Sequence, residues 1–233
     1  MAGQQVPDAA ERAEQLRVAE QGAARLFEAI AAHDLLSPGR RESEISTAIK
    51  ELAAQELGVR SYWHKRVIRV GPNTLHPYDD NPPDRVLGDD DIAFVDLGPI
   101  FAEWEADFGR TFVLGDDPVK QRLRDDVERA WAAGKEYFDD NPACTGADLY
   151  AFAVAQAREM GWEFGGEIAG HLIGEFPHVR IDDDEIGSYV VPQNTEPMRS
   201  IDPLGRPRHW IQEVHFVDRQ RQIGGFFEQL LTI

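Results

Sequence analysis

Acidic residues flanked by apolar residues or glycine recur along the chain, and they are the side chains best suited to chemistry. Four short segments carry them together with one histidine: Val95-Asp96-Leu97-Gly98, Ala106-Asp107-Phe108-Gly109-Arg110-Thr111, Gly170-His171-Leu172-Ile173-Gly174 and Asn194-Thr195-Glu196-Pro197-Met198. A fifth segment, Gln212-Glu213-Val214, is less distinctive alone. Each has an ordinary explanation when taken singly, because 42 of the 233 residues are acidic and most such residues lie in solvent. Their combination indicates a site.

The position of the first aspartate suggests which chemistry this would be. Asp96 ends the apolar run Ala93-Phe94-Val95, where a buried strand would present its last side chain to a site. Burying a carboxylate without a partner is costly, so Asp96 either pairs with a cation or reaches solvent. Asp107 begins the returning strand, near enough across a hairpin to share that cation. Converging carboxylates repel one another, and two divalent ions would neutralise them. An oxygen-rich set with one imidazole suits Mn, Fe, Co or Zn better than it suits a purely structural zinc ion, which prefers thiolates and imidazoles.

The elements that must position these residues follow from hydrophobic periodicity. Apolar stripes at helical spacing predict helices at about residues 8–33, 42–57, 118–137 and 145–160. Runs of β-branched and aromatic residues predict strands at about 62–70, 92–96, 110–114, 189–191, 210–217 and the C-terminus. Helices and strands gathered into alternating blocks favour an α+β fold with an antiparallel sheet. No linker divides the chain, so a single catalytic domain over 1–233 is expected.

Composition excludes several classes of function. The formal net charge of −18 argues against a nucleic-acid partner, since phosphate binding relies on a basic surface. The single cysteine, Cys144, cannot form an intramolecular disulfide. No apolar stretch is long enough for a bilayer, and the first residues are polar rather than signal-like, so no membrane partner is expected. A reducing, cytoplasmic location is the resulting expectation.

The order of the chemical residues resembles a known family. Asp96, Asp107 eleven residues later, His171 in a Gly-His-x-x-Gly setting, Glu196 in a Thr-Glu-Pro setting and a final Glu213 resemble the pita-bread metallohydrolases. That family includes methionine aminopeptidases, aminopeptidase P, proline dipeptidases and creatinase. The likeness runs from about Tyr62 to the end of the chain. It implies a short single-domain form of the pita-bread fold, in which helices flank a curved antiparallel sheet.

The resemblance also implies a role for each residue around two divalent metal ions (Mn, Co, Fe or Zn). The two aspartates and Glu213 would bridge or chelate the metals, while His171 and Glu196 would each complete one metal's shell. Glu196 would also relay a proton to the leaving nitrogen. Two further histidines would bind the scissile carbonyl or shuttle protons: His76 after Gly71-Pro72-Asn73, and His178 seven residues after His171. Three others have weaker claims, namely His64, His209 and His215.

Several neighbours depart from the family pattern. The usual Gly-Tyr before the second aspartate is replaced by Glu103-Trp104-Glu105-Ala106, and Pro77 rather than glycine follows His76. Ile211 stands where proline peptidases usually carry arginine two residues before the final glutamate, and Val179-Arg180-Ile181 replaces an acidic segment after His178. These departures concern the substrate more than the metal centre.

The resemblance therefore favours a dinuclear metal-dependent hydrolase, an aminopeptidase or Xaa-Pro dipeptidase in which a metal-bridging hydroxide attacks an amide carbonyl. Two alternatives stay open: the same scaffold acting on a C–N, C–O or C–S bond of a non-peptide small molecule, and a non-enzymatic binding module. The retained ligand types argue against the second. The expected partner is a small peptide or other small molecule, and a homodimer is left open.

Overall fold

Four helices form where the periodicity predicts them. The computed structural model describes residues 8–177 and 186–233. The helices are α1 (Ala9–Ala32), α2 (Glu42–Glu56), α3 (Pro118–Asp140) and α4 (Gly146–Glu159). Side chains cap their first turns: Asp8 accepts a hydrogen bond from the Glu11 amide, and Thr145 forms a capping box with Asp148. None of the helices in the described ranges is long and apolar enough to cross a bilayer.

The strands form an antiparallel sheet, which confirms the α+β prediction. Its order is β1 (Val67–Val70), β2 (Ile92–Leu97), β5 (Phe108–Val113), β9 (Ile223–Leu230), β8 (His209–Asp218) and β6 (Glu163–Phe164). β7 (Gly170–Ile173) also pairs with β8. A small separate hairpin of β3 (Ile100–Phe101) and β4 (Trp104–Glu105) interrupts the connection from β2 to β5.

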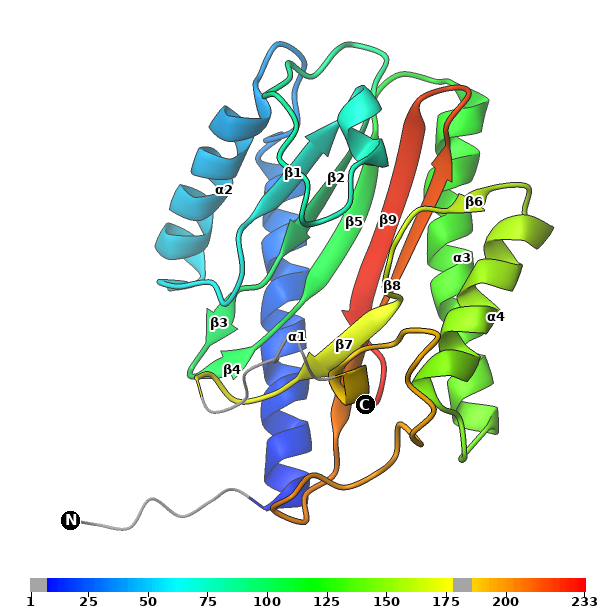
Figure 1. The fold of residues 1–233 in the computed structure, drawn as a ribbon. Helices are drawn as coiled ribbons and strands as arrows, with labels where there is room; N and C mark the ends of the chain where they lie inside the picture. Colours follow the sequence, from blue (N-terminus) through cyan, green and yellow to red (C-terminus); the bar gives the residue numbers. More distant parts are fainter. Residues whose placement is uncertain (1–7, 178–185) are drawn as a thin grey trace.

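The helices flank the sheet, and α1 and α3 lie behind it in the view of Figure 1. Successive side chains of a strand point to opposite faces, so each central strand divides its residues between two environments. Val95, Val214 and Phe227 are buried in the hydrophobic clusters formed with the helices. Their chain neighbours Asp96, Glu213 and Glu228 instead line a cavity on the other face.

One predicted strand is shorter than the sequence suggested, and another is absent. The run 62–70 is a regular strand only from Val67, and Tyr62 makes a single bridge to Pro99. Trp63 donates its indole N–H to the Ala106 carbonyl, and this contact holds the segment against the hairpin instead of in the sheet. The predicted strand at 189–191 is wrong: Tyr189 makes only an isolated bridge to His171. Pro192, which has no N–H to donate to a ladder, follows this segment.

Candidate metal centre

A row of paired residues across the sheet brings three carboxylates together. Asp96 pairs with Gly109, Gly109 with Glu228, and Glu228 with Glu213, so the row crosses β2, β5, β9 and β8. Paired residues present their side chains on the same face. Asp107 lies two residues before Gly109, immediately before β5, and therefore shares that face. A Cβ at Gly109 would lie 2.4 Å from the Phe226 ring, so glycine keeps this row open.

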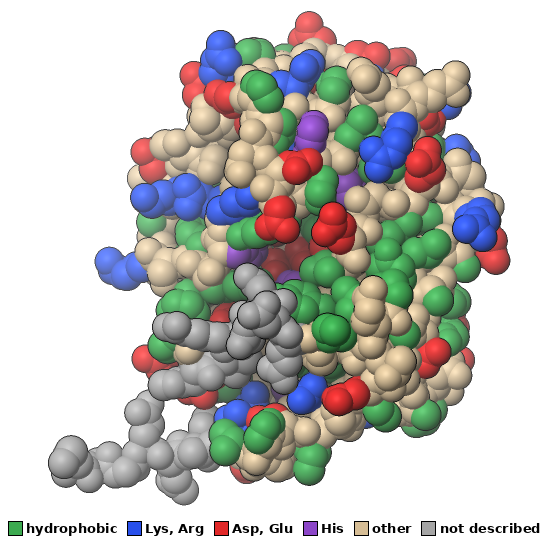
Figure 2. Space-filling model, in the orientation of Figure 1, with side chains coloured by type: hydrophobic (Ala, Val, Ile, Leu, Met, Phe, Trp, Pro, Cys, Tyr) green, Lys and Arg blue, Asp and Glu red, His purple; other side chains and the backbone are tan. Residues whose placement is uncertain are grey.

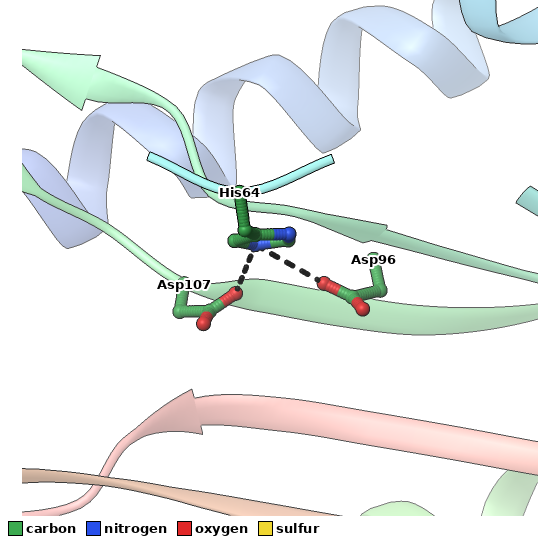
Figure 3. Close-up of side chains that lie close together, drawn as sticks. All are labelled: His64, Asp96 and Asp107. Carbon is green, nitrogen blue, oxygen red and sulfur yellow. Dashed lines mark hydrogen bonds and ion pairs between the residues drawn. The ribbon is translucent and has the colours of Figure 1, made fainter. Parts of the chain in front are cut away.

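Two imidazoles approach opposite oxygens of Asp107. His171, on β7, places Nε2 3.1 Å from Asp107 Oδ2 and 3.7 Å from Glu228 Oε1. His64, in the loop before β1, places Nε2 3.1 Å from Asp107 Oδ1 and 3.6 Å from Asp96 Oδ1 (Figure 3). The cluster therefore consists of four carboxylates and two histidines.

The carboxylates are buried and incompletely satisfied. Asp96, Asp107 and Glu228 are 7%, 2% and 2% exposed. Within the described ranges, Asp96 Oδ1, Glu213 Oε1 and Glu228 Oε2 have no hydrogen-bond partner. Ligand atoms of His64, Asp96 and Asp107, and those of Asp107, His171 and Glu228, lie within 4.8 Å of one another in each group. Buried oxygens that lack donors and converge with imidazole nitrogens fit divalent cations.

The electrostatics of the metal-free cluster show the same need for positive charge. Burial raises the pKa of Asp96 to about 7 and of Glu213 to about 8, and it raises the pKa of Glu228 well above the ordinary value. Burial also opposes ionisation of Asp107, but the charge of His64 and the hydrogen bond from His171 outweigh it and hold the pKa of Asp107 below the ordinary range. Asp107 is thus the fixed anion between the histidines, and its neighbours are driven toward their neutral forms.

A cavity of about 1020 Å³ opens onto the cluster. Its described lining includes six aromatic residues: Trp63, Tyr78, Phe94, Phe176, Tyr189 and Phe226. It also includes four acidic residues outside the cluster: Asp79, Asp80, Glu105 and Glu167. Figure 2 shows acidic and histidine side chains gathered around and within a hollow on this face. No Lys or Arg is among the described residues that line the cavity.

The structure brings together four of the five ligands predicted from the sequence: Asp96, Asp107, His171 and Glu213. It does not bring Glu196 to them. Glu196 is exposed and does not line the cavity. The buried Asn194 accepts a hydrogen bond from the Glu196 amide and donates one to the Tyr189 carbonyl, and these bonds hold the loop that carries Glu196. Glu228 occupies the position in the cluster that the Thr-Glu-Pro motif had suggested for Glu196.

The two predicted assisting histidines have different outcomes. His76 binds Asp80 through Nδ1 at 2.8 Å, and its side chain is 43% exposed. Asp80 and Pro77 line the cavity but His76 does not, so the structure places His76 behind the rim. His178 lies outside the described residues.

One member of the cluster, Glu228, was not predicted from the sequence, and another, His64, had only a weaker claim. Glu228 interrupts the apolar strand Phe226-Phe227-Glu228, and a carboxylate at an alternating position of such a strand was the available signal. His64 had no neighbouring motif, because the loop before β1 and not local sequence directs its side chain to the aspartates.

The comparisons with known proteins identify the family and the fold. The model of Metallopeptidase family M24 matches residues 14–200, and the chain therefore belongs to that family. No curated protein sequence matches the chain.

Solved structures share the fold. A prolidase from Thermococcus sibiricus is 18% identical with a TM-score of 0.74, covering 95% of this chain and 56% of that one. A dipeptidase from Mycobacterium ulcerans is 24% identical with a TM-score of 0.74, covering 96% and 55%. A methionine aminopeptidase from Rickettsia prowazekii is 16% identical with a TM-score of 0.68, covering 94% and 96%. The chain thus spans a little over half the length of the first two, and the predicted pita-bread fold is confirmed.

Proposed function

We propose that the chain is a dinuclear metal-dependent hydrolase with aminopeptidase or dipeptidase activity. The observation that carries this proposal is the row of the buried Asp96 and Glu228 and the half-buried Glu213 beside Asp107 and His171. These five residues replace the ligand set predicted from the sequence, with Glu228 in place of Glu196. When bound, two divalent ions such as Mn, Co, Fe or Zn supply Lewis acidity that activates water and polarises an amide carbonyl.

The protein contributes orientation and proton storage. Hydrogen bonding of His171 Nδ1 to the Leu172 carbonyl at 2.9 Å fixes the ring, with Nε2 directed at Asp107. Glu105 lines the cavity, and its side chain accepts a hydrogen bond from the Gly174 amide at 3.0 Å. Burial raises the pKa of Glu105 to about 7, so this carboxyl can hold or release a proton near neutral pH. It is a better-placed proton carrier than the exposed Glu196.

The charge of the cavity supports a substrate with a free amino group. Asp79, Asp80 and Glu167 line the cavity beside aromatic rings, and such walls favour a protonated amine over a carboxylate. This pattern supports aminopeptidase action more than recognition of a dipeptide's C-terminal carboxylate. The prolidase and dipeptidase titles of similar structures keep Xaa-Pro dipeptides among the substrates to test.

The experiment compares metal content and hydrolysis of matched peptides with and without added Mn²⁺ or Co²⁺. The panel contains Xaa-Pro and Xaa-Ala peptides, each with a free or an acetylated amino terminus. We expect two metal ions per chain and hydrolysis of the free-amine members only. Absence of metal under every loading condition would overturn the proposal. Stoichiometric metal without hydrolysis of any peptide would favour the alternative, a non-peptide small-molecule substrate.

Two matched variants distinguish the ligand sets. Glu228→Gln should lose metal stoichiometry and hydrolysis, whereas Glu196→Gln should retain both, because Glu196 is exposed and outside the cavity. The reverse pattern would restore Glu196 to the metal centre and remove Glu228 from it.

A further inference from the structure

His64 and His171 occupy equivalent positions on the two sides of Asp107. Each Nε2 lies 3.1 Å from a different carboxylate oxygen of that residue. Each Nδ1 lies within hydrogen-bond distance of the carbonyl of the next residue, Lys65 for His64 at 2.6 Å and Leu172 for His171 at 2.9 Å. The proposed ligand set uses only His171, so the matching imidazole needs its own explanation.

The hydrogen bond of His64 determines which nitrogen can act. A carbonyl oxygen only accepts, so Nδ1 of His64 must carry the hydrogen that is donated to Lys65. Once Nε2 gives up its own proton, its lone pair is directed at Asp107 and Asp96 (Figure 3). A ring fixed in this way by a backbone carbonyl is the usual arrangement of a metal-ligating histidine.

The residues around His64 enclose its ring. Its side chain is 7% exposed, although Lys65 next to it and Ser61 three residues earlier are exposed. Trp63 packs edge-on against it at 4.5 Å between ring centroids, and Trp63 is itself anchored to the Ala106 carbonyl. Gly98 lies beneath the ring: a Cβ there would be 2.1 Å from His64 Cδ2. Only a residue without a side chain at this position lets the imidazole reach the aspartates.

We propose that His64 is a sixth protein ligand of the metal centre, binding through Nε2 the ion held by Asp96 and Asp107. This inference rests on the proposed function. Each of the two ions then has one imidazole, with Asp107 between them. Without His64, the ion beside Asp96 would have only oxygen ligands from the protein. With the imidazole nitrogen added, that site favours Co²⁺ or Zn²⁺ over Mn²⁺.

The test is titration of the metal-free full chain with Co²⁺ alone, followed by calorimetry and by the visible absorption of the bound ion. In the wild type we expect two ions per chain. In His64→Ala and His64→Gln one of the two should bind at least roughly tenfold more weakly, the minimum effect of disturbing even a partner of a ligand. The absorption of that ion should also change, because a nitrogen ligand has been removed.

Gly98→Ala provides a second route that retains the histidine. Its added methyl group should displace the ring and weaken the same ion. The matched control is His33→Ala, since His33 Nε2 also contacts a carboxylate, Glu56 at 2.7 Å, but on the exposed end of α1. This control should leave both affinities and the spectrum unchanged.

The outcomes separate the two proposals. A wild type that binds no Co²⁺ would overturn the proposed function and His64 ligation together. A wild type that binds two ions, with both His64 variants binding them at the same affinities, would overturn His64 ligation alone. Weakened binding with an unchanged absorption spectrum would also overturn it, because the histidine would then act through the fold and not as a ligand.

Discussion

The two faces of the central strands use the same backbone for opposite purposes. On the helix-covered face, Val214 and Phe216 are fully buried among apolar side chains. On the cavity face of the same strand, Glu213 and His215 line the cavity. The apolar face gains free energy from every buried carbon, at roughly 25 cal/mol per Å². The cavity face holds acidic groups that repel one another until a cation arrives.

Alternate residues along β2, β8 and β9 therefore serve stability and function separately. One residue stabilises the sheet and the next belongs to the site, so neighbouring substitutions should have opposite consequences. The helix-facing residues must also compensate for the cost of the buried carboxylates. Four predictions test this division.

The largest effect is expected on the helix-covered face. Phe216→Ala removes a ring that is 0% exposed in the cluster with Leu123 and Val127. It should lower the free energy of unfolding by about 3–5 kcal/mol, as measured by urea denaturation of the metal-free protein. Folded Phe216→Ala should still bind metal at wild-type stoichiometry. A loss below about 1 kcal/mol would contradict the assignment of this face to stability.

Metal binding should offset the free-energy cost of burying the acidic groups on the cavity face. Ions that bind only the folded state at 100 times their dissociation constant stabilise it by about 2.7 kcal/mol per site. For each site that is filled, the thermal midpoint should therefore rise by roughly 5–10 °C on adding Co²⁺ and fall again with a chelator, followed by circular dichroism. An identical midpoint in both conditions would show that the carboxylate row does not hold a cation.

Removing one carboxylate should stabilise the metal-free protein while destroying the site. Glu228→Gln removes the cost of burying an ionisable carboxyl, and of placing it beside Asp107, Asp96 and Glu213, so we expect a gain of about 1–2 kcal/mol in unfolding free energy without metal. Glu163→Gln is the control, because Glu163 is 63% exposed on β6 and should show neither effect. Destabilisation of metal-free Glu228→Gln would mean that the charge supports the fold.

The smallest effect concerns an acid outside the metal centre, on the helix-covered face. Glu20 of α1 accepts a hydrogen bond from the Leu230 amide at 3.3 Å, and burial raises its pKa to about 8 from an ordinary 4.5. The folded state therefore holds this proton more tightly than the unfolded chain. Its stabilising contribution is complete below about pH 4.5 and is lost as the pH rises through about 8.

Glu20→Gln should consequently lose less stability than the wild type between pH 5.5 and pH 9, measured as urea midpoints of the two proteins side by side. The difference between the two slopes isolates Glu20, because the cavity acids titrate in both. Parallel slopes would show that Glu20 has no raised pKa in the folded protein.

The sequence predicted the helices, most strands and four residues of the cluster, namely Asp96, Asp107, His171 and Glu213. The helix periods and caps lie within single segments, and Asp96 and Asp107 are joined by one short connection, so their proximity follows from a hairpin. The continuous apolar run of β2 likewise indicates a buried strand, and all six of its residues are buried. His171 was selected by its Gly-His-x-x-Gly setting together with the order of the other residues, although the strand that carries it was not predicted.

Tertiary structure decided the rest of the site, because its members meet only through strand order. Glu228 reaches Asp96 because β9 lies between β5 and β8 in the sheet, an order that no local pattern contains. Glu196 had the more distinctive motif, yet its loop carries no ladder that would place it in the row. His64 reaches the aspartates because Gly98 leaves room for its ring, a contact between two loops distant in sequence. Residue types thus determined the chemistry, and strand pairing decided which residues perform it.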